Sequence, residues 1–402
     1  MLKKLLRGSA VALVASFPLL AQAVPAAAAG GGTLFGITGF NQSVLSTIDP
    51  ASGVVTDIRD MAGPEQGQLV SITGDPIAHR IYADRQATIF IPPSTILVHQ
   101  QILTINSDTG AFTASGMVNT PSGLVAFDPG TNTLYLLGFF GLFRVDPVTG
   151  DTTAVARFAD ASSMAVVPGA NTIYVGQTFF AFDTGQFSYD VITVNTLTGA
   201  TSTSPVNPGR LGFLMYDSSA GLLMTSDNMN LYGVDPTSGV ENVISNYNTN
   251  PQALFFFAGA VDSSTNTVYL QLNVFDFFNP IDQIATINDQ NGGFTTSTGN
   301  LTTNQLESTY FQPQVTVTPD SIAADVRASL ASGAITKEGI ASSLLSELDA
   351  AKAARDRGQC KTASNIYQQF VDDVSAQSGK SITVATASRL TSEAEFLQGN
   401  CP

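Results

Sequence analysis

The stretch Val145-Asp146-Pro147-Val148-Thr149-Gly150 ends an apolar segment with a tight turn, and the chain contains six copies of that turn. The other five occupy residues 48–53, 105–110, 194–199, 234–239 and 287–292. Asp or Asn opens each turn by bonding its own backbone, and the closing Gly accepts the positive φ that precedes the next strand. The copies are 40 to 57 residues apart, which suits a four-stranded propeller blade. The spacing therefore predicts an all-β, six-bladed β-propeller.

A second repeated element precedes most of these turns. It consists of a short apolar strand, a polar turn and a strand rich in β-branched or aromatic residues, which is the pattern of a hairpin. Clear copies occupy residues 127–135, 167–174 and 261–269, and weaker copies occupy residues 73–82 and 216–223. We expect each blade to begin with this hairpin and to join its third and fourth strands through the six-residue turn.

The first blade lacks a first strand of its own. Residues 33–37 have the pattern of a second strand, and residues 310–317 are the candidate for the missing one. Pairing these segments would bury the two sheet edges that an open ring exposes. The repeat region has no room for a seventh blade.

A change in composition marks a second domain. Residues 24–319 contain 22 acidic residues, six Arg and no Lys, whereas residues 320–402 contain ten acidic and eight basic residues and are rich in Ala. Apolar residues recur at helical spacing in residues 321–332, 337–357, 362–376 and 383–397. We therefore expect a propeller over residues 33–318, followed by a small all-α helical bundle over residues 319–402.

The N-terminus predicts export. Three basic residues among the first seven precede the apolar residues 9–20, and Ala21-Gln22-Ala23 supplies the small residues that signal peptidase accepts. An apolar run of about 12 residues is too short to span a membrane, which needs roughly 20. We expect a signal peptide over residues 1–23, cleavage after Ala23, a linker over residues 24–32, and a secreted or periplasmic protein with no membrane span.

The charge of the chain argues against nucleic acid as a partner. The formal net charge is −15, and removing the signal peptide, with three basic and no acidic residues, changes it to −18. Phosphate binding needs clustered Lys and Arg, which this acidic sequence lacks.

The sequence offers little for catalysis. The two histidines are His79, in a turn, and His99, beyond a Pro-Pro pair, and no Gly-X-Ser-X-Gly nucleophile elbow is present. Most Asp and Asn residues lie in turns, where they cap the backbone, and no EF-hand spacing occurs. We therefore expect no catalytic residue, no bound metal and no cofactor.

Two other functions remain open. A lactonase-like hydrolase would hold a metal in the central channel through Glu, Asn and Asp, but the propeller contains only Glu65, Glu241 and Glu307. Of these, Glu241 follows a strand-connecting turn and so belongs to the wrong face. A small-ligand sensor for a sugar or a quinone is the other alternative. The absence of Trp weakens it, because both ligands usually stack on indole rings.

The connection between the second and third strands alternates in length from blade to blade. It is long in blades two, four and six, and short in blades three and five. The long connections are rich in aromatic residues, which we predict to form a binding surface for a protein or another extracellular ligand. The candidate residues are Phe90, Phe179, Phe180, Phe277 and Phe278. The alternative is that these rings pack on one another and only lengthen the hairpins.

Two resemblances to known families support this interpretation. The turn motifs of residues 33–318 resemble those of secreted bacterial propellers with YVTN and quinoprotein-like repeats, which implies the fold and no particular activity. The tail resembles the FIMAH domain, a small helical module at the end of many exported bacterial enzymes and binding proteins, which implies an extracellular accessory domain. The residues that carry the second resemblance are 332–348, Ala363, Phe370, Val374 and Ile382. Together these features predict an exported bacterial binding or surface-interaction protein with no reaction of its own.

Cys360 and Cys401 are the two cysteines of the chain, and both lie in the expected helical domain. An even pair in an exported protein predicts a disulfide, which on the chain-entropy account stabilises the domain by about 4 kcal/mol. Protein recovered from the medium or periplasm should contain no free thiol when it is alkylated without reductant and its mass is measured. Two alkylated cysteines would contradict the disulfide.

Overall fold

The computed structural model describes residues 32–400, except for a set of short segments. These are residues 39–41, 64–66, 92–94, 120–122, 139, 159–160, 182–185, 204–212, 227–229, 247–258, 275–280, 302–305, 307 and 315–316. The predicted signal peptide, residues 1–23, and Cys401 therefore lie outside the described residues.

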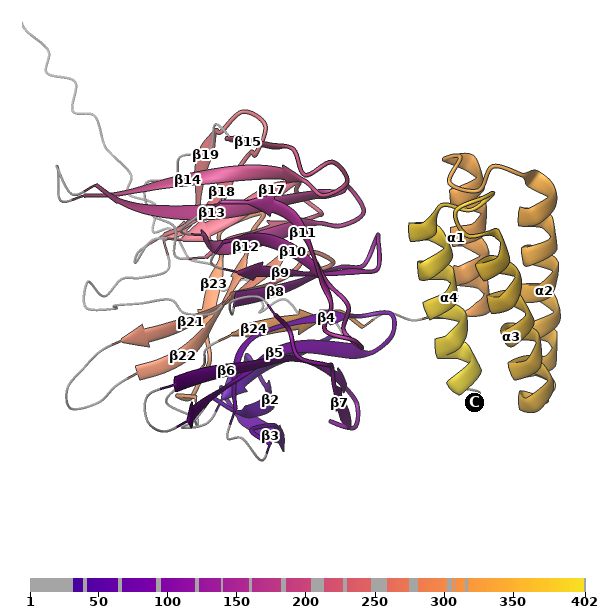
Figure 1. Ribbon diagram of the computed structural model, residues 1–402, viewed down its shortest axis with the longest axis horizontal. Coiled ribbons are helices and arrows are strands. Elements are labelled where there is room, and N and C mark those ends of the chain that lie inside the picture. The colour runs from indigo at the N-terminus through magenta and orange to yellow at the C-terminus, as the bar shows by residue number, and fades with distance from the viewer. Residues whose placement is uncertain are drawn as a thin grey trace, which may run out of the picture.

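Six four-stranded antiparallel sheets form one lobe, and four helices form a second lobe beside it (Figure 1). Blade 1 comprises β24 (Thr309–Gln312), β1 (Thr33–Thr38), β2 (Val44–Ile48) and β3 (Val55–Asp60). Blade 2 comprises β4 (Gln68–Asp75), β5 (Arg80–Ile91), β6 (Thr95–Asn106) and β7 (Phe112–Ala114). Blade 3 comprises β8 (Gly123–Asp128), β9 (Thr133–Gly138), β10 (Gly141–Val145) and β11 (Thr152–Arg157).

The other three blades have the same strand order. Blade 4 comprises β12 (Ala161–Val167), β13 (Thr172–Ala181), β14 (Gln186–Asn195) and β15 (Thr201–Thr203). Blade 5 comprises β16 (Met215–Asp217), β17 (Leu222–Ser226), β18 (Asn230–Val234) and β19 (Glu241–Asn246). Blade 6 comprises β20 (Gly259–Asp262), β21 (Thr267–Val274), β22 (Ile281–Asn288) and β23 (Phe294–Thr296).

The first strand of each blade lies innermost and contacts the first strands of its two neighbours. These contacts run in the order β24, β4, β8, β12, β16, β20 and back to β24. The sheets therefore form a closed ring, and the predicted six-bladed propeller is confirmed.

The six-residue turns have the predicted backbone chemistry. Asp146 Oδ1 accepts hydrogen bonds from the N–H groups of Val148 (2.7 Å) and Thr149 (3.0 Å), and Gly150 has a φ of 80°. The other turns are capped in the same way by Asp49, Asn106, Asn195, Asp235 and Asn288. These carboxylates and amides hold the turns, as the sequence indicated.

Strands β24 and β1 close the ring, as predicted. They pair antiparallel, with Leu34 opposite Phe311 and Phe35 opposite Tyr310. The closing strand is shorter than the predicted residues 310–317 and ends at Gln312, because the next residue is a proline, which has no N–H to donate to the ladder. Phe311 also stacks on Tyr269 of blade 6, with the ring centroids 5.3 Å apart.

Apolar side chains between neighbouring sheets hold the blades together. Ile37 and Leu45 of blade 1, for example, pack with Ile72, Ile81 and Leu103 of blade 2 in one buried cluster. Comparable clusters fill the other five junctions of the ring, including the junction of blades 6 and 1. Because each cluster is shared by two blades, a single blade cannot bury its own apolar faces.

The C-terminal lobe is the predicted helical bundle. Its helices are α1 (Pro319–Ala331), α2 (Glu338–Asp356), α3 (Cys360–Gln377) and α4 (Val384–Gly399). Thr318 caps α1, since its Oγ1 accepts from the N–H of Ser321 (3.0 Å) while Ser321 Oγ accepts from the N–H of Thr318 (2.9 Å). Cys360 opens α3, but its predicted partner is not described, so the disulfide remains a prediction. Among the described helices, none is long and apolar enough to cross a membrane.

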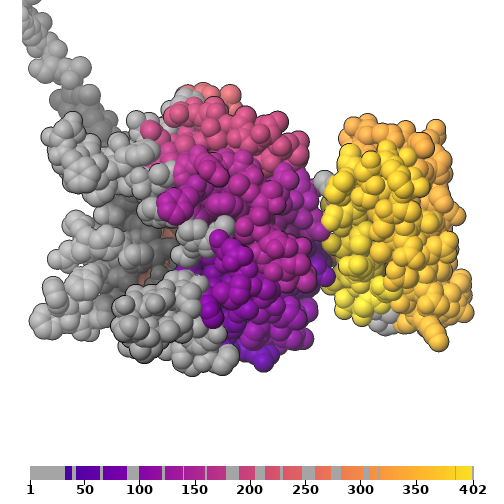
Figure 2. Space-filling model, in the orientation of Figure 1, coloured from indigo at the N-terminus to yellow at the C-terminus, as the bar shows by residue number. Residues whose placement is uncertain are grey.

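The helical bundle contacts one face of the propeller. His79 of blade 2 stacks on Phe396 of α4 with ring centroids 4.8 Å apart, and Ile77 packs against the helical core. Asn132 of blade 3 donates a hydrogen bond through Nδ2 to Ser388 Oγ. These residues lie in turns that join first to second strands, so we call this side of the ring the turn face. The two lobes meet over a small area (Figure 2).

Removing the Phe311 ring should weaken the whole propeller, because ring closure depends on it. Phe311 is 5 % exposed, and truncation of a buried Phe to Ala costs about 3 to 5 kcal/mol. Phe311→Ala should therefore lower the midpoint of propeller unfolding in urea, followed by circular dichroism. Phe294→Ala, at a 38 % exposed position of the outer strand β23, is the control and should leave the midpoint nearly unchanged. Equal shifts in the two variants would show that closure does not hold the ring.

Candidate functional site

Three long hairpins project from the side of the propeller opposite the helical bundle (Figure 1). β5 and β6 have 12 residues each, β13 and β14 have 10 each, and β21 and β22 have 8 each. The corresponding strands of blades 3 and 5 have only 5 or 6 residues. The predicted alternation of blades two, four and six is therefore confirmed. We call this side the hairpin face.

Three of the candidate aromatic residues lie on the strands of these hairpins. The backbone places Phe90 opposite Ile96, and Phe179 opposite Ser188. Phe180 occupies the next position of β13. Phe277 and Phe278 lie outside the described residues. The expectation that the five rings form one surface thus remains a prediction.

Buried pairs of Asp and Gln fix the bases of two long hairpins. In blade 2, Gln100 Nε2 donates to Asp84 Oδ1 at 3.0 Å, and the N–H of Gly123 in blade 3 donates to the other carboxylate oxygen at 3.4 Å. In blade 6, Gln271 Nε2 donates to Asp282 Oδ1 at 2.8 Å. The acid lies on the second strand in blade 2 and on the third strand in blade 6. The same interaction therefore recurs with the two residue types exchanged.

Burial makes these acids hold their protons more tightly. Asp84 is fully buried, and burial raises its pKa to about 6, although hydrogen bonds from Gln86, Gln100 and Gly123 oppose the shift. Burial likewise raises the pKa of Asp282, whose Oδ2 has no hydrogen-bond partner among the described residues. Both carboxyls are buried and pair with a glutamine of the neighbouring strand, so each ties the two strands of its hairpin together.

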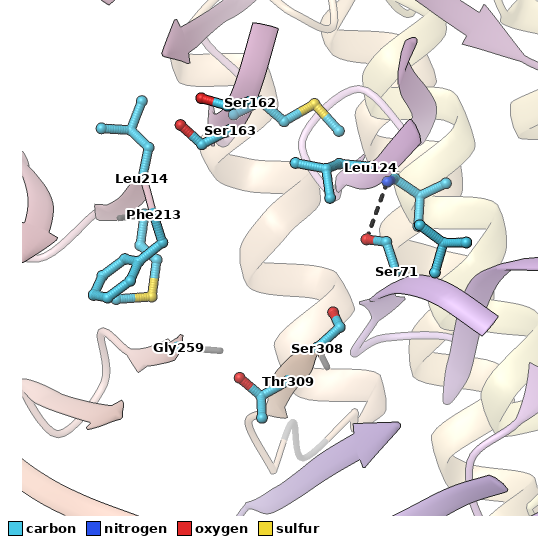
Figure 3. Close-up of a pocket in the computed structure, with 13 residues that line it drawn as sticks. Ser71, Leu124, Ser162, Ser163, Phe213, Leu214, Gly259, Ser308 and Thr309 are labelled. Carbon is cyan, nitrogen blue, oxygen red and sulfur yellow. Dashed lines mark hydrogen bonds between the residues drawn. The ribbon is translucent and has the colours of Figure 1, made fainter. Parts of the chain in front are cut away.

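The mouth of the central channel lies on the hairpin face. Antiparallel strands alternate in direction, so the start of each first strand and the turn between its second and third strands lie at the same end of the blade. A cavity of about 180 Å³ is formed where the innermost strands begin (Figure 3). Each blade contributes to its lining, through Thr309, Ser71, Leu124, Ser163, Leu214 and Gly259 in ring order.

Neutral polar and apolar groups line this cavity. Two of its hydroxyls accept backbone hydrogen bonds, Ser71 Oγ from the N–H of Val125 and Ser308 Oγ from the N–H of Ile72, both at 3.2 Å. Ser163 Oγ is buried and has no partner in the described part of the chain. None of the described lining residues is titratable. The described lining therefore suits water or a small neutral polar group, and it includes none of the carboxylates that hard divalent cations prefer.

Of the residues weighed for catalysis, the described ones, Glu241, His79 and His99, do not line this cavity. Glu241 is exposed and begins β19, the outermost strand of blade 5, while Glu65 and Glu307 lie outside the described residues. His79 Nδ1 lies 3.2 Å from Asp108 at the turn face, and His99 lies in β6 opposite Ala87.

An apolar notch in blade 3 was missed by the sequence analysis. Phe140, Phe143 and Phe158 line it together with Arg157, and Phe140 is 61 % exposed. Phe140 lies between β9 and β10, and Phe158 follows β11, so both belong to the hairpin face. The sequence signal for this notch was the pair of aromatic residues in the very short connection between β9 and β10, where small turn residues would suffice. We call this feature the blade 3 notch.

Comparison with known proteins identifies the tail. Residues 319–399 match the FIMAH domain family, which confirms the resemblance of the helical bundle. No curated protein matches the chain. A solved structure of a structural genomics protein of unknown function from Bacteroides thetaiotaomicron is similar over 70 % of this chain and 67 % of that chain, with 12 % identity and a TM-score of 0.44.

The raised pKa of Asp84 predicts a pH-dependent stability difference. In the unfolded chain this Asp loses its proton near pH 4, whereas in the folded protein it keeps the proton until about pH 6. As the pH rises through this range, the free energy of unfolding therefore falls by about 3 kcal/mol. Asp84→Asn lacks this titration, and Gln100 can turn its unpartnered Oε1 toward the new amide. The unfolding free energy of the variant, measured in urea at pH 4, 5 and 7, should therefore rise relative to wild type as the pH rises. Asp151→Asn, at an exposed position, is the control, and a constant difference across this range would contradict the buried titration.

Proposed function

We propose that this protein is an exported, non-catalytic binding protein that engages an extracellular partner through its hairpin face. The observation that supports this most directly is the presence of three long hairpins in alternate blades, all on the face where the central channel opens. Long loops on one face of a repeat protein are typical of its binding side.

The blade 3 notch adds described apolar side chains to this face. Phe140 is mostly exposed beside Phe143 and Phe158, and Arg157 lies at the same place. Aromatic residues together with Arg are the types enriched at protein interfaces. A protein partner with an apolar side chain framed by acceptor groups suits this combination.

The position of the helical bundle also favours the hairpin face. It contacts the turns of blades 2 and 3 on the opposite side, so it does not compete for the proposed surface. A match to the FIMAH family supports the role of an accessory domain. The predicted signal peptide with cleavage after Ala23, and the resemblance to secreted YVTN-type propellers, support a periplasmic or extracellular location.

A small-ligand sensor is the second candidate, and one observation favours it. The buried hydroxyl of Ser163 has no partner among the described residues and lies at the wall of the channel cavity. A small neutral ligand could satisfy it. A metal-dependent hydrolase has no comparable support, because the described lining offers hydroxyls and no carboxylates.

Replacing hairpin aromatics should separate binding from stability. The mature protein, labelled with a fluorophore, would be titrated onto the cell-envelope fraction of the producing bacterium. Changing Phe179, Phe180, Phe277 and Phe278 together to Ser should abolish saturable binding and leave the melting temperature nearly unchanged, because hairpin tips contribute little to the blade core. Phe140→Ser should weaken binding with equally little effect on stability, since its ring is exposed.

The matched control lies on the turn face. Val148 and Leu197 are 77 % and 69 % exposed in their turns, so changing both to Ser should preserve binding. If the hairpin rings instead pack on one another, the quadruple variant would lose about 3 to 5 kcal/mol for each buried ring. A large loss of stability, or unchanged binding, would overturn the proposal.

A further inference from the structure

One turn of the propeller has a histidine where the equivalent turns of the other blades have Asn or Gly. The residue before the second strand has a positive φ in blades 3 to 6, where it is Asn132, Asn171, Gly221 and Asn266. Gly and Asn adopt this left-handed conformation most readily. Blade 2 instead has His79, with a φ of 51°. The conformation of the turn therefore does not explain the imidazole ring.

The backbone around His79 matches that of another even blade. The carbonyl oxygen of His79 accepts from the N–H of Ser107 at 2.9 Å, and that of Asn171 in blade 4 accepts from the N–H of Thr196 at 2.9 Å. The turn of blade 2 thus has the backbone hydrogen bond that an Asn supports in blade 4. Only the side chain distinguishes the two turns.

The side chain of His79 contacts the helical bundle. Its ring stacks on Phe396 of α4, with the ring centroids 4.8 Å apart and an angle of 21° between the ring planes. Nδ1 lies 3.2 Å from both carboxylate oxygens of Asp108, in the third turn of the same blade. Asp108 therefore holds the ring in the orientation that meets α4. Nε2 is buried and has no hydrogen-bond partner among the described residues.

The rest of this interface is small and largely polar. Ile77 packs against the helical core, and Asn132 donates a hydrogen bond to Ser388. A cavity of about 350 Å³ remains between the lobes, and charged side chains of both line it, including Arg80 and Glu395. Small polar contacts between domains permit relative motion. Few apolar contacts are therefore available to hold the bundle in place if the ring stack is lost.

We propose that the helical bundle exchanges between a docked and an undocked position, and that the ring of His79 holds it in the docked one. His79 is thus a positioning residue for the bundle, placed where three other blades have Asn. Undocking would expose Phe396 and the adjacent face of α4 to a partner and would leave the hairpin face unchanged. This device goes beyond the proposed function and does not depend on it.

Small-angle X-ray scattering of the full mature protein tests the device. His79→Asn introduces the residue of blades 3, 4 and 6, so the turn should keep its conformation while the stack is lost. An aromatic pair changes a contact equilibrium by a factor of about two to ten. The ratio of undocked to docked protein fitted to the scattering should rise by that factor, and the radius of gyration should increase. The midpoint of propeller unfolding in urea, followed by circular dichroism, should stay unchanged.

A second variant tests whether the effect depends on the stack. Phe396→Leu removes the other ring but keeps an apolar side chain against the helical core, and it should raise the undocked ratio to a similar extent. The double variant should show no further rise, because the two residues form one contact. The matched control is Asn171→His, the reverse exchange in blade 4, away from the residues that contact the bundle. It should scatter as the wild type does.

Three results would overturn the proposal. The first is that His79→Asn scatters like the wild type, which would show that the ring does not hold the bundle. The second is a lower midpoint of propeller unfolding in His79→Asn, which would assign the ring to the stability of blade 2. The third is additive effects in the double variant, which would show that His79 and Phe396 act separately.

Discussion

The antiparallel pairing of β24 with β1 is the contact on which the arrangement of the whole chain depends. It joins residues 33–36 to residues 309–312, so blade 1 cannot be completed until the other five blades are in place. Because β24 is an inner strand, it runs from the hairpin face to the turn face, and the chain leaves the ring there. α1 begins only seven residues after β24 ends. Closure therefore confines the helical bundle to the turn face and leaves the hairpin face accessible.

Polar contacts between blades differ more than the apolar ones do. Each junction contains a buried aliphatic or aromatic cluster of similar character. The polar groups beside these clusters are instead specific to a junction: Asp84 reaches Gly123, Gln312 reaches Ser107, and Asp217 meets Asp289. A repeat can share its apolar core because apolar packing tolerates similar residues, whereas a buried polar group needs a particular partner. These contacts distinguish one junction from the next and so help to fix the order of the blades.

The sequence predicted the parts of this structure that repeat. Turn residues such as Asp146 and Gly150 act locally through their own backbone, so their role can be predicted without knowing the fold. The spacing of the turns predicted the number of blades, and the missing first strand of blade 1 predicted the closing segment. The exact end of β24 required knowing the ladder partner of each residue. The blade 3 notch and the contact of Asp217 with Asp289 could not be predicted from the sequence, for a different reason. Phe158 and Asp217 contact side chains that are distant in the sequence, and no repeat or periodicity of the sequence predicts those contacts.

The repeating unit of the propeller is best described as a pair of blades, because odd and even blades differ in the same way around the ring. Odd blades have Asp-Pro turns, through Pro50, Pro147 and Pro236, and their second and third strands are short. Even blades have Asn followed by a residue with an N–H, which bonds the first turn, and they carry the long hairpins. Proline cannot make that bond because it has no N–H. Three two-blade units therefore give the hairpin face an approximate threefold pattern. The exchanged positions of Asp and Gln in blades 2 and 6 show that the copies have diverged.

This pattern bears on the kind of partner that the proposed binding function would involve. A partner that presents a repeated epitope would engage several hairpins at once and gain avidity without any single strong contact. A compact partner would instead use one hairpin together with the adjacent blade 3 notch. For the proposed binding function, the divergence between copies, together with a notch in one odd blade, favours a compact partner.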